Sequence, residues 1–235
     1  MLMFMQPLPG RAERVTPEAP PASVTRTNAG ADQRRRFLRA VAELVAERGY
    51  PDLTVELIVK RAQASNKTFY KHFAGKEECF IALFESSFAE TERAIRERLA
   101  AEPAPWPEQV VLALRTLVER ICADPITARA VIVESPSVGP AIAARYEQAS
   151  KALVPLFAAG REQNPRGAEL PATIEETLSG AVFWAAFERL VIGAPQELAA
   201  YLPVLIELVL RPYLGPAEAA RLARAEAPAG EPALA

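Results

Sequence analysis

The sequence predicts an all-α protein in which an N-terminal helix-turn-helix unit precedes a larger helical bundle. Apolar residues recur every three to four positions along most of the chain, and alternating Val-, Ile- and Thr-rich runs are missing. Proline and glycine divide this pattern into segments of helical length. Apolar residues make up 50% of the 235 residues, enough to bury a core in one or two domains.

The N-terminal unit contains three predicted helices. Thr54 and Ser65 are suitable N-caps for two short helices, because a hydroxyl oxygen there can accept a bond from an otherwise unpaired backbone N–H. Two short helices joined by a turn of three or four residues form a helix-turn-helix. The expected ranges are 32–48, 55–62 and 66–72.

A long amphipathic helix is predicted from Lys76 to about Ala100, and it would link this unit to the bundle. The bundle helices are expected at 107–123, 125–134, 138–163, 171–192 and 195–213, with a short one at 216–225. The resulting organisation is a disordered arm (1–30), a helix-turn-helix domain (31–91), a helical ligand-binding and dimerisation domain (92–215), and a short helix with a disordered tail (216–235).

The composition excludes most enzyme classes. Only Cys79 and Cys122 are cysteines, and His72 is the single histidine, so we expect no metal site. The 11 glycines are too widely spaced for a phosphate-binding loop, and we expect no cofactor. No apolar run approaches the roughly 20 residues of a membrane span, and no secretory signal is recognisable, so the expected compartment is the cytoplasm.

Charge is distributed unevenly along the chain. Residues 31–76 contain ten Lys or Arg and five Asp or Glu, a net charge of +5, whereas residues 77–235 carry a net charge of −8. Such asymmetry is typical of a protein in which one module binds a polyanion. Clustering by chance is the alternative explanation of the charge pattern alone.

The third predicted helix has the side chains of a groove-reading helix. Asn66, Lys67, Thr68, Tyr70 and Lys71 occupy its exposed positions, while the neighbouring phenylalanines can face the core. Asn can form two hydrogen bonds with adenine, Lys can donate to guanine, and the Thr methyl can contact thymine. An ordinary solvated helix face is the alternative reading of these residues taken singly.

Residues 54–77 read TVELIVKRAQASNKTFYKHFAGKE. This segment resembles the DNA-binding region of the tetracycline-repressor (TetR/AcrR) family of transcriptional regulators, most closely in TFYKHF and the following Lys-Glu. With the first helix, the resemblance covers about residues 31–91; beyond it, only the family's helical plan is shared. The resemblance implies DNA-backbone contacts by Thr54, Tyr70, His72 and Lys76, and base reading by Asn66, Lys67 and Thr68.

The segment departs from the family pattern at two positions. Gln63 stands where the turn commonly has glycine, and a left-handed conformation there would cost about 1–2 kcal/mol. Lys67 stands where a small residue is common, so the base preference cannot be transferred from relatives. The run Arg34–Arg36 is a further candidate for phosphate or minor-groove contact, with a solvated charge run as the alternative.

In the second domain, the family resemblance implies a small-molecule cavity, and an apolar or aromatic effector is expected. Aromatic residues spread over three helices are candidates to line it, although each of them can equally be core. Glu188 would need a cation if it pointed inward. The candidate ligand-binding residues are Tyr146, Phe157, Phe183, Trp184, Phe187 and Glu188, with Glu134, Arg145 and Arg189 as further polar partners.

The two helices expected at 171–192 and 195–213 offer broad apolar faces. The resemblance implies that they pair with their copies in a homodimer, which is what reading a palindromic DNA site requires. The candidate dimer residues are Leu178, Val182, Leu198, Leu202 and Leu205.

Together these observations predict a dimeric regulator, most simply a repressor, that binds a palindromic DNA operator and releases it when a small effector binds. Two alternatives come from other classes. One is a non-specific nucleoid or partner-binding protein without an effector, which would not distinguish a palindrome from random duplex. The other is a helical enzyme with an aromatic cavity, for which the sequence offers no catalytic constellation.

Overall fold

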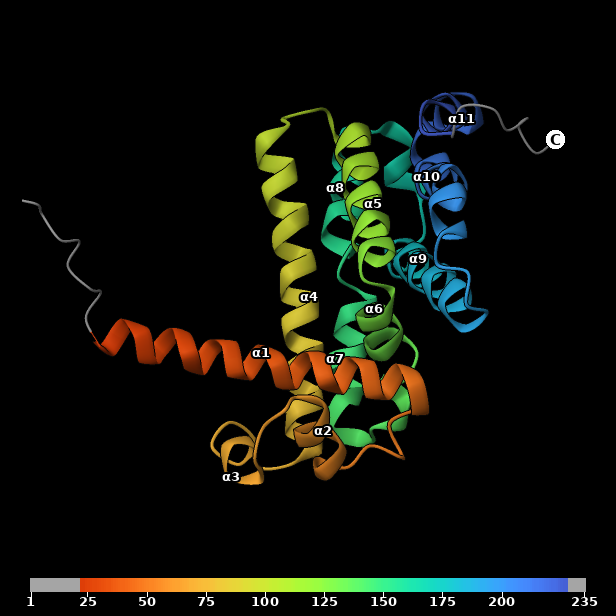
Figure 1. The fold of residues 1–235 in the computed structure, drawn as a ribbon. Helices are drawn as coiled ribbons and strands as arrows, with labels where there is room; N and C mark the ends of the chain where they lie inside the picture. The colour runs from red at the N-terminus through yellow and green to blue at the C-terminus, as the bar shows by residue number, and fades with distance from the viewer. Residues whose placement is uncertain (1–21, 228–235) are drawn as a thin grey trace, which may run out of the picture.

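The computed structural model describes residues 22–227, and this part of the chain folds into eleven α-helices and two short 3-10 helices (Figure 1). The predicted all-α class is therefore confirmed. No helix within residues 22–227 is long and apolar enough to span a membrane. The expected tails at 1–21 and 228–235 lie outside the described residues.

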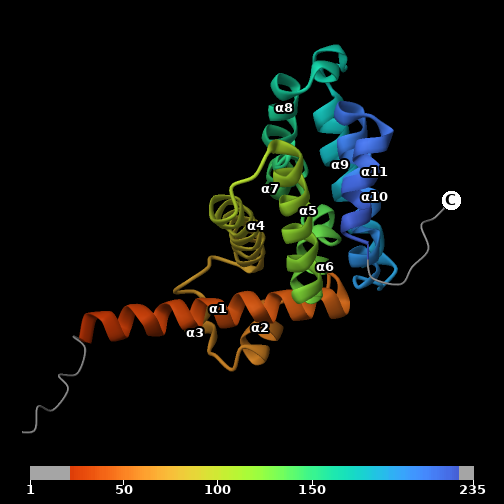
Figure 2. The same cartoon turned by 90° about the horizontal axis from the view of Figure 1, so that it is seen from above.

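Three helices form the N-terminal unit: α1 (Ala22–Arg48), α2 (Val55–Arg61) and α3 (Asn66–Phe69). α1 begins ten residues before its predicted start at 32, because no proline follows Pro21 before the helix ends. Residues 22–30 therefore continue the helix instead of belonging to the expected disordered arm. In two views α1 crosses the foot of the bundle, with α2 and α3 on its other side (Figures 1 and 2).

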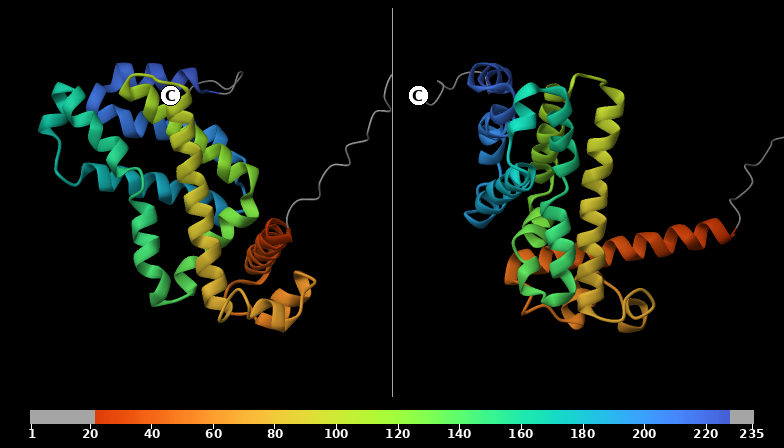
Figure 3. Two further views of the ribbon diagram at one scale, coloured as in Figure 1. Left: turned by 90° about the vertical axis from the view of Figure 1, so that its left-hand side faces the viewer. Right: turned by 180° about the vertical axis from the view of Figure 1, so that it is seen from behind.

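α4 (Lys76–Ala101) matches its prediction and runs along the bundle from the α2–α3 corner (Figure 3). It packs against α5 (Trp106–Ala123), and α6 (Pro125–Ile132) follows after the single residue Asp124. Asp124 caps α6 by accepting a hydrogen bond from the Thr127 backbone N–H at 3.2 Å. The α5–α6 corner is therefore stiff, and α6 packs directly on α1.

The prediction of a single helix at 138–163 is wrong. The chain forms instead a 3-10 turn (Ser135–Ser137), α7 (Pro140–Ser150) and α8 (Val154–Gln163). Pro155 explains the break, because it has no N–H for the Lys151 carbonyl and its ring would clash with that carbonyl in a continuous helix.

A second 3-10 helix (Pro165–Glu169) leads to α9 (Ile174–Val191), α10 (Glu197–Leu214) and α11 (Pro216–Ala225). Three of the bundle helices are joined at the buried carboxylate of Glu175, which accepts bonds from Arg161 Nε at 2.7 Å and Tyr213 Oη at 2.9 Å. Burial would raise the pKa of Glu175, but these hydrogen bonds outweigh it and lower the pKa. The carboxylate is thus held in its charged form.

The turn after α2 ends that helix in a Schellman arrangement. The Ala64 N–H bonds the Val59 carbonyl at 2.9 Å, and the Gln63 N–H bonds the Lys60 carbonyl at 3.2 Å. This pattern requires a left-handed backbone at the residue that follows the C-cap. Gln63 occupies this position and has φ +50°. The chain therefore keeps this turn with Gln63 in the left-handed conformation and tolerates the strain.

We expect Gln63→Gly to raise the free energy of unfolding by about 0.5–1 kcal/mol. Glycine relieves a left-handed penalty of about 1–2 kcal/mol, and part of this gain is offset by its greater freedom in the unfolded chain. Urea unfolding followed by circular dichroism measures the change. Gln63→Val is the matched control, since a β-branched residue tolerates this conformation worst and should lower stability. Equal stability of all three proteins would contradict the strained turn.

Candidate functional site

The caps that position α2 and α3 lie where the sequence predicts them. Thr54 Oγ1 accepts from the Leu57 N–H at 3.3 Å, and Ser65 Oγ accepts from the Thr68 N–H at 3.1 Å. Ser65 Oγ also lies 2.9 Å from Thr68 Oγ1. These hydroxyls therefore have structural partners, and only their remaining hydrogen-bonding capacity is free for another molecule.

α3 is shorter than the predicted range 66–72. It ends at Phe69, and the chain continues in tighter turns in which the Lys71 N–H bonds the Thr68 carbonyl at 3.3 Å and the His72 N–H bonds the Phe69 carbonyl at 2.8 Å. Residues 70–72 thus stay beside the helix although they lie outside it.

Two buried phenylalanines hold α3 against α1. Phe69 and Phe73 lie 5.3 and 6.2 Å from the ring of Phe37, both edge to face. His72 is half-buried 5.9 Å from the same ring. The side chains left exposed are Asn66, Lys67, Tyr70 and Lys71, and Tyr70 is 58% exposed. The structure therefore presents a polar, planar and basic surface on a rigid aromatic base.

Lys76 is not a free cation in this structure. Its Nζ donates to the carbonyls of Leu53 at 2.8 Å and Pro51 at 3.3 Å, and it lies 4.8 Å from the centre of the Tyr50 ring. The ammonium joins the α1–α2 loop to the first turn of α4. Its predicted contact with the DNA backbone remains a prediction, for which it would have to share its donors.

The run Arg34–Arg36 is not simply solvated. Arg34 lies over the Phe73 ring at 5.5 Å, and Arg36 donates to the Ala62 carbonyl at 2.6 Å. Arg35 pairs with Asp32 in the preceding turn. Two of these arginines therefore attach the helix-turn-helix to α1.

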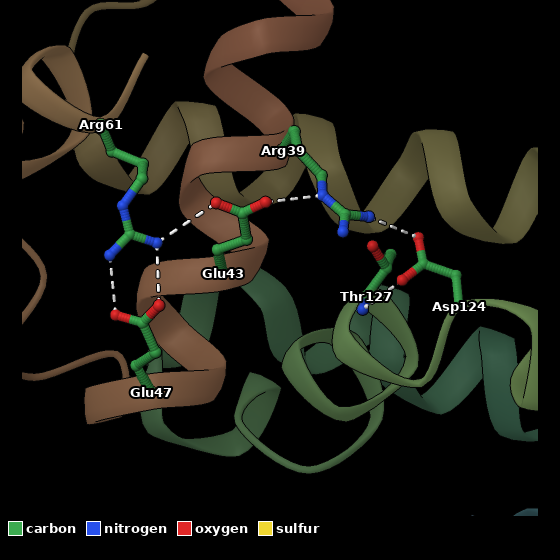
Figure 4. Close-up of polar contacts among 6 residues, drawn as sticks. All are labelled: Arg39, Glu43, Glu47, Arg61, Asp124 and Thr127. Carbon is green, nitrogen blue, oxygen red and sulfur yellow. Dashed lines mark hydrogen bonds and ion pairs between the residues drawn. The ribbon is translucent and has the colours of Figure 1, made fainter. Parts of the chain in front are cut away.

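A chain of ion pairs connects the bundle with the helix-turn-helix (Figure 4). Arg39 of α1 bonds Asp124 at the α5–α6 corner at 3.2 Å and Glu43 at 2.8 Å. Arg61 of α2 bonds Glu43 at 3.2 Å and Glu47 at 2.8 Å. The hydrogen bond from Arg39 lowers the pKa of Glu43 against the opposing effect of burial, with Arg61 adding to it, so the chain is charged at neutral pH.

The bundle contains a small apolar chamber of about 60 Å³ between α4, α5 and α9. Phe183, one of the candidate ligand residues, lines it next to Phe88, Leu117 and Val182. Tyr146 lies behind the chamber, 5.1 Å from the Phe183 ring, and donates to the Ile132 carbonyl at 2.8 Å.

The other candidate ligand residues do not meet at this chamber. Phe157 is fully buried in the core. Trp184 is 62% exposed and stacks on Phe187 at 5.1 Å on the outer face of α9. Glu188 is exposed and pairs with Arg189 at 2.8 Å, so it needs no buried cation. Among the further polar candidates, Arg145 pairs with Glu85 at the surface.

The sequence reasoning missed the chamber residues on α4 and α5. Phe88 and Ile95 belong to the apolar stripe of α4, which the helical period shows clearly, and Leu117 and Ile121 form the facing stripe of α5. The period identifies these residues as inward-facing. The period does not show that a cavity remains between the two stripes.

The candidate dimer residues are also placed differently. Leu178, Val182, Leu198, Leu202 and Leu205 are at most 6% exposed within a single chain, because this stripe packs on the bundle. In a single chain they therefore form part of the core instead of an exposed surface. The opposite faces of α9 and α10 carry a separate apolar patch, which consists of Trp184, Val191, Ile192, Val204 and Leu208.

The helix-turn-helix region of this chain is similar to a known protein family. A family model described as "Bacterial regulatory proteins, tetR family" matches residues 37–83, which contain α2, α3 and their aromatic base. The match covers the helix-turn-helix region and does not extend over the rest of the chain. The description names regulatory proteins, which agrees with the expectation that the chain is not an enzyme.

The individual proteins that are similar to this chain share little sequence identity with it. An uncharacterised HTH-type transcriptional regulator, YdgC of Bacillus subtilis, is 32% identical over 99 residues, which are 40% of this chain and 50% of the relative; the match therefore spans half the length of that protein. The fatty acid degradation regulator FadR of Bacillus halodurans superposes with a TM-score of 0.68 at 20% identity over 76% of this chain and 94% of that chain. FadR of Bacillus subtilis, solved in complex with stearoyl-CoA, superposes with a TM-score of 0.60 at 17% identity, over 77% of this chain and 98% of that chain. At these identities the structures establish a shared fold.

We expect Lys76→Met to lower the free energy of unfolding by about 1–2 kcal/mol, because two carbonyls lose a charged donor while the side-chain stem is kept. The salt dependence of DNA binding should stay unchanged if the ammonium acts only within the protein. Thermal unfolding and binding titrations over a range of salt concentrations measure the two effects.

The exposed Lys71 supplies the control for this variant. Lys71→Met should leave stability unchanged and reduce the salt slope by about 1, as the loss of one phosphate contact does. A Lys76→Met protein of normal stability with a slope reduced by 1 would show instead that Lys76 contacts DNA.

Proposed function

We propose that this chain is a cytoplasmic, homodimeric regulator of the TetR family that binds a palindromic DNA site and is released from it by a small apolar or aromatic effector. The observation that carries the proposal is the exposed face of Asn66, Lys67, Tyr70 and Lys71 on a helix fixed by Phe37. Side chains that read base edges must be both accessible and rigidly placed, and this surface is both.

The apolar patch on α9 and α10 supports the dimer. Its residues are between 38% and 62% exposed and lie on the side of these helices that faces away from the bundle. A two-fold interface through α9 and α10 would cover these exposed apolar side chains with their own copy. The two recognition helices must then lie about 34–36 Å apart to enter successive major grooves on one face of the duplex.

Release by an effector needs a ligand that binds the two arrangements of the dimer with different affinity. A coupling free energy of 1–3 kcal/mol would change DNA affinity about 5- to 150-fold. The stearoyl-CoA in the structure of FadR from Bacillus subtilis supports a small-molecule effector with a large apolar part. Repression is the simplest outcome of such release.

Selection of bound duplexes from a random pool tests DNA recognition. We expect an inverted repeat, with affinity for it well above that for random duplex at the same salt concentration. Equal affinity for both would favour a non-specific nucleoid protein and contradict our proposal.

Asn66→Ala should relax the preference at one base pair of each half-site and cost about 1–3 kcal/mol of binding free energy there. The same selection with the variant protein measures this effect. An unchanged motif would show that Asn66 does not read a base.

Leu208→Glu should convert the dimer into a folded monomer, because it places a carboxylate among the exposed apolar side chains that a partner would cover. Sedimentation velocity measures the mass, and circular dichroism confirms the fold. Ala217→Glu adds the same charge at an exposed position of α11 and should leave the mass unchanged. A dimeric Leu208→Glu protein would move the interface elsewhere.

A further inference from the structure

The apolar chamber is too small for a whole effector. Its volume of about 60 Å³ is far below the roughly 300 Å³ at which ligand pockets usually begin. It adjoins a second cavity, here called the junction cleft, of about 320 Å³ between α1, α4, α5 and α6. Five residues line both spaces: Phe88, Thr91, Leu117, Ile121 and Ile132. A ligand with its apolar end in the chamber therefore has to extend into the junction cleft.

Polar and charged side chains form part of the wall of the junction cleft, whereas the wall of the chamber is almost entirely apolar. Its lining includes three arginines, Arg35, Arg39 and Arg120, against two carboxylates, Glu90 and Asp124. The cleft thus places three guanidinium groups, each paired with a carboxylate, next to an apolar interior. Hydroxyl groups of Ser86, Ser87, Thr91 and Thr127 complete its polar lining.

We propose that the junction cleft binds the negatively charged end of an amphipathic organic anion, such as a carboxylate, whose apolar end enters the chamber. This proposal rests on the proposed function and specifies the class of effector. Arg39 and Arg120 are the residues that bind the anionic group, since both guanidinium groups lie in the wall of the cleft and stay partly exposed.

The present partners of these arginines favour exchange with an incoming anion. Arg120 reaches Glu90 at 3.3 Å, and Arg39 reaches Asp124 at 3.2 Å; both pairs are largely open to solvent and contribute little to stability. A carboxylate ligand can form a bidentate pair with a guanidinium group, which is shorter and stronger. The carboxylate of Asp124 is held by the Thr127 N–H, so a ligand can take Arg39 from it without unfolding α6.

Capture of Arg39 would act directly on the DNA-binding unit. The Arg39–Asp124 pair joins α1 to the α5–α6 corner, and through Glu43 it continues to Arg61 on α2 (Figure 4). An anion in the junction cleft therefore competes with the contact that links bundle and helix-turn-helix. This competition provides the difference in affinity between two arrangements that release requires.

The test compares three probes with the same chain and different ends: octanoate, octan-1-ol and octylamine. Calorimetric titration into the full chain without DNA measures binding. We expect octanoate to bind at least tenfold more tightly than the alcohol, and the amine to bind most weakly. Equal binding of octanoate and octan-1-ol, tighter binding of octylamine, or no binding of octanoate would overturn the proposal.

Arg120→Gln should weaken octanoate binding about tenfold or more while leaving octan-1-ol unaffected, because one charged hydrogen-bond donor is lost. Arg98→Gln is the matched control. Arg98 also forms an α4–α5 ion pair, at 3.4 Å to Glu119, but lies outside the cleft. Equal effects of the two substitutions would assign the loss to the bundle in general and overturn the role of Arg120.

These titrations contain no DNA, so their outcome is separate from that of the proposed function. DNA binding is measured on the same proteins by fluorescence anisotropy with the selected duplex. If octanoate binds as expected but DNA affinity for an inverted repeat is absent, the regulator proposal fails and the cleft assignment stands. If DNA is bound specifically and octanoate is not, the cleft assignment fails alone.

Discussion

The arrangement of the whole molecule depends on the burial of α1 from two sides. Phe37 faces α3, whereas its neighbour Leu38 faces the bundle in the wall of the junction cleft. Val41 and Val45 are fully buried between them. The segment 37–45 is apolar around most of its circumference and must be enclosed, and here the helix-turn-helix and α6 enclose it together. One continuous core therefore runs through both units, and the recognition surface cannot turn freely against the bundle.

The polar contacts across this junction have a different role from the apolar ones. The pairs of Arg39 and Arg61 are partly exposed, and such pairs typically contribute 0.2–1 kcal/mol each. Burial of Phe37 and the valines contributes several times more, at about 1.5–3 kcal/mol for each side chain. The apolar contacts therefore hold the units together, and the ion pairs add little to the stability of the junction. A contact whose loss costs little stability is suited to being exchanged for a ligand.

The sequence predicts most clearly what depends on neighbours along the chain. The caps at Thr54 and Ser65, the long helix from Lys76 and the left-handed strain at Gln63 are local, and all of them are present. The break at Pro155 is also local, and its rule was available from the sequence. α9 and α10 show what local patterns cannot supply. Both faces of these helices are apolar, so spacing cannot tell which face packs on the bundle and which stays outside, and Leu178 and Trp184 exchange their expected places.

The size of the chamber determines how a ligand can act. A cavity of about 60 Å³ cannot accept a long apolar group unless α4, α5 and α9 move apart, and close-packed interiors resist such movement. The free energy of that movement has to come from ligand contacts that exist only in the open arrangement. α4 carries Phe88 and Ile95 on the chamber wall and continues to Lys76, which is bonded to the loop in front of α2. Displacement of α4 at the chamber would therefore reach the loop in front of α2 through Lys76, in addition to any loss of the Arg39–Asp124 pair in the junction cleft.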